Sequence, residues 1–337
     1  MTIMRGLTTA TLCCALLGAI GCNQSKTQRD PTIGGRQVSV RDIAVAMPDP
    51  SNPWRKLQLD YMQRAAKETG STIHVVTIGG ASNALVKEAV GAASATRSTG
   101  LIIEPPFEDC GLTIRDDVES FGLPTIAINT RLRDADTKRY LDMPYFGLSN
   151  RDLGSFAANG AIDEARKRGW KSNETGIVVV TSGDGGKLQA RGAAIRETFL
   201  AAGYAPGQIQ GQAVNLGRYK NWMIVGGSDA PVISGIRATE AGSIPAANVI
   251  GVSIGGLGAL DELAKPSSGY FAALLIGPKE HAYDVFKRVT NAIKNGLAID
   301  PIPTFNNGVW LTRENLAKET KEQMLDQLPT YAKSIQP

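Results

Sequence analysis

WMIVGGSDAPVISGIRATEAGSIPAANVIGVSIGG, residues 222–256, contains two apolar runs separated by a helical pattern. The runs span 222–225 and 249–254, and a pair of glycines follows each of them. Between them, Ser228 or Asp229 stands where a helix N-cap is expected. Strands that are apolar throughout are typical of parallel strands covered on both faces. The stretch therefore predicts a strand, a helix and a parallel strand, and the loops after such strands are where open α/β sheets bind ligands.

The same alternation continues along most of the chain. Further strands are expected at 43–47, 73–78, 101–104, 125–128, 176–181, 209–214 and 270–276. Helices are expected after Trp54 and at 85–95, 152–169, 188–202, 257–264 and 279–295. About 295 residues carry this pattern, which exceeds one ordinary core. The fold class that follows is α/β, with two doubly wound sheets.

The N-terminus has the pattern of an export signal. Arg5 supplies a basic start, 7–20 is an apolar run too short to span a bilayer, and small residues precede Cys22. We expect residues 1–21 to be a lipoprotein signal peptide, with Cys22 lipidated as the new N-terminus, and 22–41 to be a polar tether. The alternative is an ordinary secretory signal with an incidental cysteine. Either way, the protein is expected outside the cytoplasm, and the lipid would be its only membrane attachment.

Composition and motifs exclude several classes of function. Removing the signal takes away Arg5, so the net charge falls from +4 to +3, too small to favour nucleic acid. The two histidines, His74 and His281, lack metal-ligand spacing, so we expect no metal and no cofactor. TSGDGGK (181–187) departs from a phosphate loop at its first glycine and after its lysine. The sequence shows no pattern of catalytic residues, so we expect that the protein is not an enzyme.

Six segments carry a resemblance to a known family. They are NPW (52–54), KRGWKSNET (167–175), QARGAAIRETFLAAGY (189–204), KNWMIVGGSDAPVISGIRATEAGSIPAANVIGVSIGG (220–256), SGYFAALLIGPKEHAYDVFK (268–287) and VWLTRENLAKE (309–319). These segments resemble the L-arabinose-binding branch of the type I periplasmic binding proteins, the solute receptors of ABC sugar importers. The resemblance implies two Rossmann-like lobes that close over a sugar, and an ABC permease as partner.

The resemblance also implies where the lobes divide. Three hinge strands would cross near Leu148, Gly277 and Asn307. The N-lobe would comprise 42–148 plus 278–307, and the C-lobe 149–277 plus 308–330.

The family's ligand contacts carry over only in part. Trp54 matches an aromatic residue that stacks on the apolar face of the sugar, and Arg191 matches an arginine that holds its ring oxygen and hydroxyls. The family's other polar contacts fall on Pro48, Asn52, Asn129, Thr130, Ser228 and Gly255. Such a pocket would not hold arabinose in the family's way, so we expect a small polar ligand, a saccharide of unspecified identity.

Each candidate site residue also has a structural interpretation. Trp54 could cap the first helix, Arg191 could form an ion pair, and Ser228 could be an N-cap residue. Further candidates lie at strand ends that face the predicted cleft, where ordinary loop polarity is the alternative. They are Asp49, Asn52, Asn129 and Arg131. Glu104 ends a buried strand just before two prolines, and it is either a carboxylate of the cleft or an anchor on the hinge side.

One connection departs from the family. Only seven residues, NLGRYKN (215–221), separate the strand predicted at 209–214 from Trp222. A parallel crossover needs a dozen or more residues, usually a helix. We therefore expect a C-lobe that lacks one crossover helix, with the strand at 209–214 rearranged or unpaired, or else a damaging deletion.

Two other functions stay open. A ligand-sensing receptor for a membrane signalling partner would have the same lobes, and so would a degenerate paralogue that no longer binds. Sugar-responsive repressors also share them, but an export signal stands here in place of a DNA-binding domain.

Overall fold

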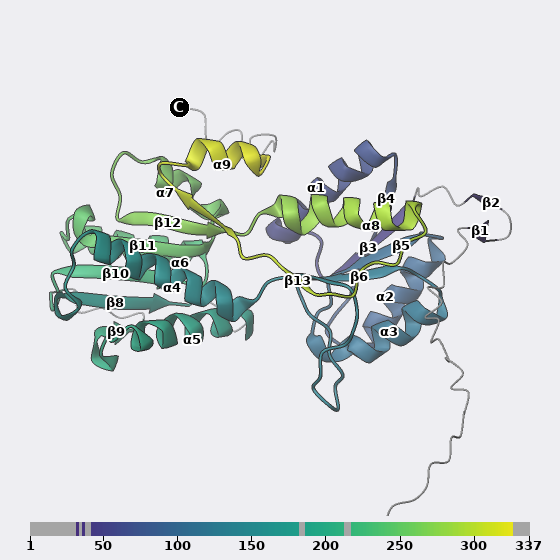
Figure 1. Cartoon of the computed structure of the whole chain (residues 1–337), viewed down its shortest axis with the longest axis horizontal. Helices are drawn as coiled ribbons and strands as arrows, with labels where there is room; N and C mark the ends of the chain where they lie inside the picture. The colour runs from purple at the N-terminus through teal and green to yellow at the C-terminus, as the bar shows by residue number, and fades with distance from the viewer. Residues whose placement is uncertain (1–31, 34–35, 38–41, 182–185, 212–216, 326–337) are drawn as a thin grey trace, which may run out of the picture.

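Two six-stranded sheets, each with helices on both faces, form two lobes of an α/β fold (Figure 1). The computed structural model describes residues 32–33, 36–37, 42–181, 186–211 and 217–325. The predicted signal peptide and Cys22 lie outside these residues. Within the tether, β1 (Thr32–Ile33) pairs antiparallel with β2 (Arg36–Gln37). No helix among the described residues combines the length and apolar composition that crossing a bilayer requires.

The first lobe is built on a parallel sheet with the strand order β13-β7-β6-β5-β3-β4. Its strands are β3 (Asp42–Met47), β4 (Thr72–Thr77), β5 (Gly100–Ile103), β6 (Thr125–Ile128), β7 (Tyr145–Gly147) and β13 (Thr304–Phe305). Its helices are α1 (Pro53–Thr69), α2 (Asn83–Ala95), α3 (Gly111–Ser120), the π-helical turn η6 (Lys279–Asp284) and α8 (Val285–Lys294). Apolar side chains of α2 and α3 pack on one face and those of α1 and α8 on the other. The central strands are buried on both faces, which is why their sequences are apolar throughout.

The second lobe has the strand order β14-β12-β11-β10-β8-β9. Its strands are β8 (Thr175–Val180), β9 (Ile209–Gln210), β10 (Asn221–Gly226), β11 (Val249–Gly255), β12 (Tyr270–Leu275) and β14 (Val309–Thr312). Its helices are α4 (Asn150–Lys167), α5 (Gly186–Ala201), α6 (Asp229–Ala241), α7 (Leu260–Ala264) and α9 (Leu316–Glu322). Side chains of α4 and α5 cover one face, and those of α6 and α7 the other. Residues 222–256 form β10, α6 and β11, as predicted.

Three segments, 148–149, 276–278 and 306–308, connect the two sheets (Figure 1). The last runs from β13 in the first sheet to β14 in the second. β14 pairs antiparallel with β12, whereas the repeated βα pattern predicted parallel strands only. A strand that enters from the other lobe without a crossover helix is free to run in this direction.

Three elements of the first lobe, α3, β7 and the two-residue strand β13, were not predicted from the sequence pattern. α3 lies between β5 and β6 and buries only Gly111, Ile114 and Val118, so its apolar stripe is thin. β7 has three residues, too few for a period of two to be recognised.

The described part of the strand predicted at 209–214 is paired, which corrects the expectation that it could be unpaired; residues 212–214 lie outside the described residues. β9 forms the edge of the second sheet, parallel to β8, and covers only Ile209–Gln210. The described residues of the connection to β10, 211 and 217–220, contain no helix. Instead, the ring of Tyr219 lies edge-on to Trp222, with centroids 5.6 Å apart.

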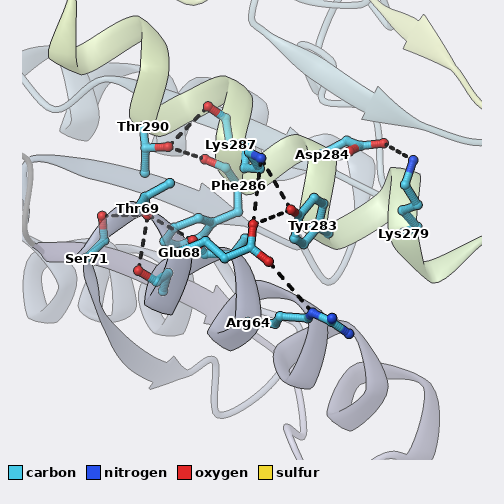
Figure 2. A network of polar contacts seen from close by, with 12 residues as sticks. Arg64, Glu68, Thr69, Ser71, Lys279, Tyr283, Asp284, Phe286, Lys287 and Thr290 are labelled. Atoms are coloured by element: carbon cyan, nitrogen blue, oxygen red, sulfur yellow. Dashed lines mark hydrogen bonds and ion pairs between the residues drawn. The ribbon is translucent and has the colours of Figure 1, made fainter. Parts of the chain in front are cut away.

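A polar network joins the two helices that cover one face of the first sheet (Figure 2). Glu68 of α1 accepts a hydrogen bond from the Tyr283 hydroxyl and lies 3.8 Å from both Lys287 Nζ and Arg64 Nε. Lys287 also donates to Tyr283, which raises the pKa of this lysine. These contacts fix α1 against η6 and α8, because they add directional bonds to the apolar packing beneath them.

Candidate functional site

A cavity of about 440 Å³ lies between the two lobes, at the carboxyl ends of the strands. Its volume is within the range of small-molecule sites. The first lobe contributes Asn52, Trp54, Arg55, Glu104 and Asn129. The second contributes Lys187, Arg191, Ser228, Asp229, Gly255 and Leu257, and apolar side chains close the remainder: Leu148, Ile254 and Ile276.

Trp54 lies half-buried in the first turn of α1. The helix begins there because the Asn52 side chain accepts hydrogen bonds from the backbone N–H groups of Trp54 (3.0 Å) and Arg55 (3.5 Å). Asn52, and not Trp54, is therefore the cap of the helix. On its inner side the indole meets the ring of His281 edge-on, with centroids 6.3 Å apart. This arrangement leaves Trp54 in the cavity lining on a fixed aromatic support.

Arg55 and Glu104 form a bidentate ion pair in the same wall. Arg55 Nε lies 2.8 Å from Glu104 Oε2, and Nη2 lies 3.1 Å from Oε1. Glu104 directly follows β5 and its side chain is 5% exposed, so its charge needs this partner. The pair presents guanidinium donors and carboxylate acceptors together at the floor of the first lobe.

Asn129 follows β6 in a left-handed conformation, with φ of 60°. Its backbone N–H donates to the Phe146 carbonyl, and Nδ2 donates to Gln58 Oε1 at 3.2 Å. The Oδ1 atom is buried and has no partner among the described residues. A carboxamide oxygen in this state is an acceptor for a bound hydroxyl or water.

Arg191 forms the centre of the opposite wall and is 8% exposed. Its Nε donates to Asn150 Oδ1 at 2.9 Å, and Nη1 donates to the Gly227 carbonyl at 2.8 Å. α4 approaches α5 closely here, since Gly154 has no Cβ atom; a Cβ atom at this position would collide with the Arg191 carbonyl. Burial lowers the pKa of Arg191 to about 10. The side chain is thus a rigid cation that keeps unused N–H donors at the cavity.

Asp229 organises the loop after β11. Its carboxylate accepts hydrogen bonds from the N–H groups of Gly256 (3.0 Å) and Gly258 (2.9 Å), and from the Ser253 hydroxyl. Desolvation raises the pKa of this carboxyl. Ser228 precedes it at the N-cap position of α6, but its hydroxyl makes no capping bond, which leaves it available to the cavity.

Lys187 lines the cavity from the first turn of α5. The side chain is exposed along the cavity wall, yet the surrounding walls desolvate the ammonium group, which lowers its pKa. Glu104 of the opposite lobe acts in the other direction, and Arg55 and Arg191 add to the lowering.

The structure brings together most of the residues that the sequence singled out. Six of them line the cavity: Asn52, Trp54, Glu104, Asn129, Arg191 and Ser228. Asp49 and Arg131 do not line it. Asp49 is exposed and holds its own loop, accepting from the Ser51 N–H at 3.2 Å. The Arg131 guanidinium lies over the rings of two aromatic residues, Tyr140 (4.2 Å) and Phe305 (5.9 Å).

Sequence reasoning missed Arg55 and Lys187, and it interpreted Asp229 mainly as a helix cap. Arg55 directly follows the NPW segment, and Lys187 ends the TSGDGGK segment, so both lay beside features already noted. Within the described residues, no group of three or more His, Cys, Asp or Glu side chains has the arrangement of a metal site.

Known proteins are similar to this chain in sequence and in fold. No family model matches the chain. The chain is 24% identical over 294 residues to the L-arabinose-binding periplasmic protein of Escherichia coli strain K12, covering 82% of this chain and 89% of that one. It is 27% identical over 274 residues to an ABC transporter L-arabinose-binding periplasmic protein of Azospirillum brasilense, covering 75% and 82%.

Solved structures give the same result for the fold. A galactofuranose-binding protein superposes with a TM-score of 0.64 at 15% identity, over 85% of this chain and 99% of that one. The relatives confirm the resemblance stated from the sequence, and the superposition confirms the two-lobed type I periplasmic binding fold.

Proposed function

We propose that this chain is a solute receptor that captures a small saccharide between its two lobes and delivers it to an ABC importer. The observation that carries the proposal is the placement of Trp54 and Arg191 on opposite walls of one cavity. An aromatic face suits the apolar face of a sugar ring, and a guanidinium suits its hydroxyls. The two similar sequences are those of L-arabinose-binding periplasmic proteins, and the superposed structure is that of a galactofuranose-binding protein.

The mechanism follows from the division of the site between lobes. A ligand that touches both walls makes all its contacts only when the lobes are closed, so binding favours the closed state. We assign 42–148 plus 278–307 to one lobe and 149–277 plus 308–330 to the other, moving about the three connecting segments. A permease would recognise the closed form.

We divide the proposed ligand contacts into principal and secondary ones. Trp54 stacks on the ring and Arg191 donates to ring oxygen or hydroxyls. Asn129 accepts from a hydroxyl through its unpartnered Oδ1, and the Ser228 hydroxyl supplies a further contact. Both lobes thereby contribute one principal and one secondary contact.

Membrane attachment through Cys22 is a separate part of the proposal. The mature chain would be a lipoprotein held at the outer face of the cytoplasmic membrane or in the periplasm. Metabolic labelling with a radioactive fatty acid should label the wild type and not Cys22→Ser. A Cys22→Ser protein that still carries the label and stays with membranes would refute the anchor.

Calorimetric titration of the chain from residue 23 onward with pentoses, hexoses, polyols and sugar acids tests the receptor function. At least one compound should bind, and Trp54→Ala should weaken it about tenfold or more, since stacking and area burial are both lost. Trp170→Ala is the matched control, because Trp170 packs on the second lobe's core away from the cavity. Equal weakening by both variants, or no binding by any compound, would contradict the proposal.

A further inference from the structure

The charges that the described residues bring to the cavity do not cancel. Among these residues the cations are Arg55, Lys187 and Arg191, and the carboxylates are Glu104 and Asp229, so three positive charges minus two negative leaves +1. Glu104 is already held by both arms of Arg55. Asp229 already accepts three hydrogen bonds from its own lobe. The surplus positive charge therefore belongs to the wall that carries Lys187 and Arg191.

The positions of these two cations on α5 are unfavourable. They are four residues apart on a helix that begins at Gly186, so they share one face of its first two turns, where like charges repel each other. Lys187, in the first turn, also opposes the helix dipole. The described residues provide neither cation with a carboxylate at ion-pair distance within their own wall. An anion bound between them would offset the charge repulsion and the unfavourable helix dipole, and would supply the missing negative partner.

We infer that the ligand is an acidic monosaccharide, with its carboxylate between Lys187 and Arg191 and its ring against Trp54. This inference rests on the proposed receptor function and names the class of ligand for the same cavity. One carboxylate balances the surplus of +1. Such a ligand would contact both lobes, because its carboxylate would bind the second lobe and its ring would pack on the first.

The geometry of Arg191 suits a carboxylate. A guanidinium has five N–H donors, and Arg191 uses Nε toward Asn150 and one hydrogen of Nη1 toward Gly227. Both hydrogens of Nη2 and one of Nη1 are left without a partner among the described residues. A planar carboxylate accepts such paired donors side by side, and Lys187 adds a mobile charge nearby.

Calorimetric titration with matched pairs of sugars tests the inference. The probes are D-galacturonate with D-galactose, D-glucuronate with D-glucose, and D-mannuronate with D-mannose, because each of these acids keeps the ring of its neutral parent. At least one acid should bind at least tenfold more tightly than its neutral parent at low salt, since hydrogen bonds to charged groups contribute about 1.5–3 kcal/mol and 1.4 kcal/mol is tenfold. The advantage should shrink as salt rises, because screening weakens partly exposed charge pairs.

Lys187→Gln separates charge recognition from other roles. The variant should lose about tenfold in affinity for the acid and distinctly less for the neutral parent, because a hydrogen bond to a neutral hydroxyl contributes less than one to a carboxylate. Lys167→Gln is the control, because Lys167 is exposed on α4 and does not line the cavity. Lys187 is itself exposed, so the variant should fold and unfold like the wild type.

Three results would overturn the inference. Neutral sugars that bind as tightly as their acids would remove it and leave the receptor function intact. Equal weakening of acid and neutral parent by Lys187→Gln would make Lys187 a contact for lobe closure, facing Glu104, and not a charge reader. Failure of all six probes to bind would count against the receptor function as well.

Discussion

The imidazole of His281 lies edge-on to the indole of Trp54, with ring centroids 6.3 Å apart and an interplanar angle of 65°. Phe146 contacts the same imidazole at 5.1 Å. His281 is fully buried, and neither ring nitrogen has a hydrogen-bond partner among the described residues. The support beneath Trp54 is therefore a set of edge-on contacts between uncharged rings, which a proton on His281 would disrupt.

This burial predicts a loss of stability in acid. Burial, with a smaller contribution from Arg191, lowers the pKa of His281 to about 3 from the usual 6.5. The unfolded chain therefore binds a proton between these values while the folded chain does not. Stability from this group is complete above pH 6.5 and falls by about 1.4 kcal/mol per pH unit below it. Urea unfolding at pH 7, 6, 5 and 4 measures the slope.

His281→Met should make that slope shallower, because the unfolded variant has no imidazole to protonate. His74→Gln is the control, since His74 is partly exposed on the edge strand β4. Carboxylates titrate in both proteins and cancel in the comparison. Parallel stability curves for the wild type and His281→Met would show that the imidazole is not held neutral.

Breaking the ion pair of Arg55 with Glu104 should destabilise the first lobe. Glu104→Gln leaves the guanidinium with one neutral acceptor in a wall where the Glu104 side chain is only 5% exposed. We expect a loss of about 1–3 kcal/mol, below the full cost of a buried pair because Arg55 is 23% exposed. The urea midpoint measures it.

The surface pair of Lys56 with Asp60 provides the matched control. Its side chains are 67% and 37% exposed, and the charged atoms are 3.3 Å apart. Asp60→Asn should change stability by less than about 1 kcal/mol. If Glu104→Gln proved as mild as Asp60→Asn, the bidentate contact would contribute little to the fold.

Asp229 should matter for both stability and binding. Asp229→Ala removes the acceptor for Gly256, Gly258 and Ser253, and the loop that it holds contributes Gly255 and Leu257 to the cavity. We expect a loss of about 2–4 kcal/mol, since hydrogen bonds to charged groups are among the stronger ones. Ligand affinity should fall too. The control is Asp261→Ala, because Asp261 is exposed on α7; this variant should change neither stability nor ligand affinity. If Asp229→Ala bound ligand as tightly as the wild type, the loop that Asp229 holds would not contribute to binding.

The sequence predicted the elements with long apolar repeats, because burial on both faces leaves an unbroken apolar run. β10, α6 and β11 are examples. It could not predict contacts between distant segments. Arg55 and Glu104 are 49 residues apart, and only the pairing of β3 with β5 brings them together.

The same reasoning explains the candidate site. Trp54 and Arg191 were found because each lies within a segment that resembles a known family. Lys187 lies in none of these segments. Its role depends on the charges that the fold places around it in the cavity, and the sequence does not show them. Arg131 shows the reverse case: it follows a strand end closely, but exposed aromatic rings attract its side chain away from the cavity.

The short connection before β10 gives the last prediction. Gly176 in β8 leaves room for the aromatic pair of Tyr219 and Trp222. A Cβ atom there would lie 2.5 Å from the Trp222 ring and 2.7 Å from the Tyr219 ring. A connection that is part of a folded lobe should therefore be sensitive to this position. Gly176→Ala should cost about 1–3 kcal/mol through overpacking and lower the urea midpoint.

Gly91→Ala is the control, because nothing lies within 4 Å of a Cβ atom there and α2 gains a better helix former. It should stabilise by about 0.5–1 kcal/mol. If Gly176→Ala left a cooperative melt unchanged, Tyr219 and Trp222 would not be packed as described. The shortened connection would then be loose, as expected of a damaging deletion and not of a natural variant of the lobe.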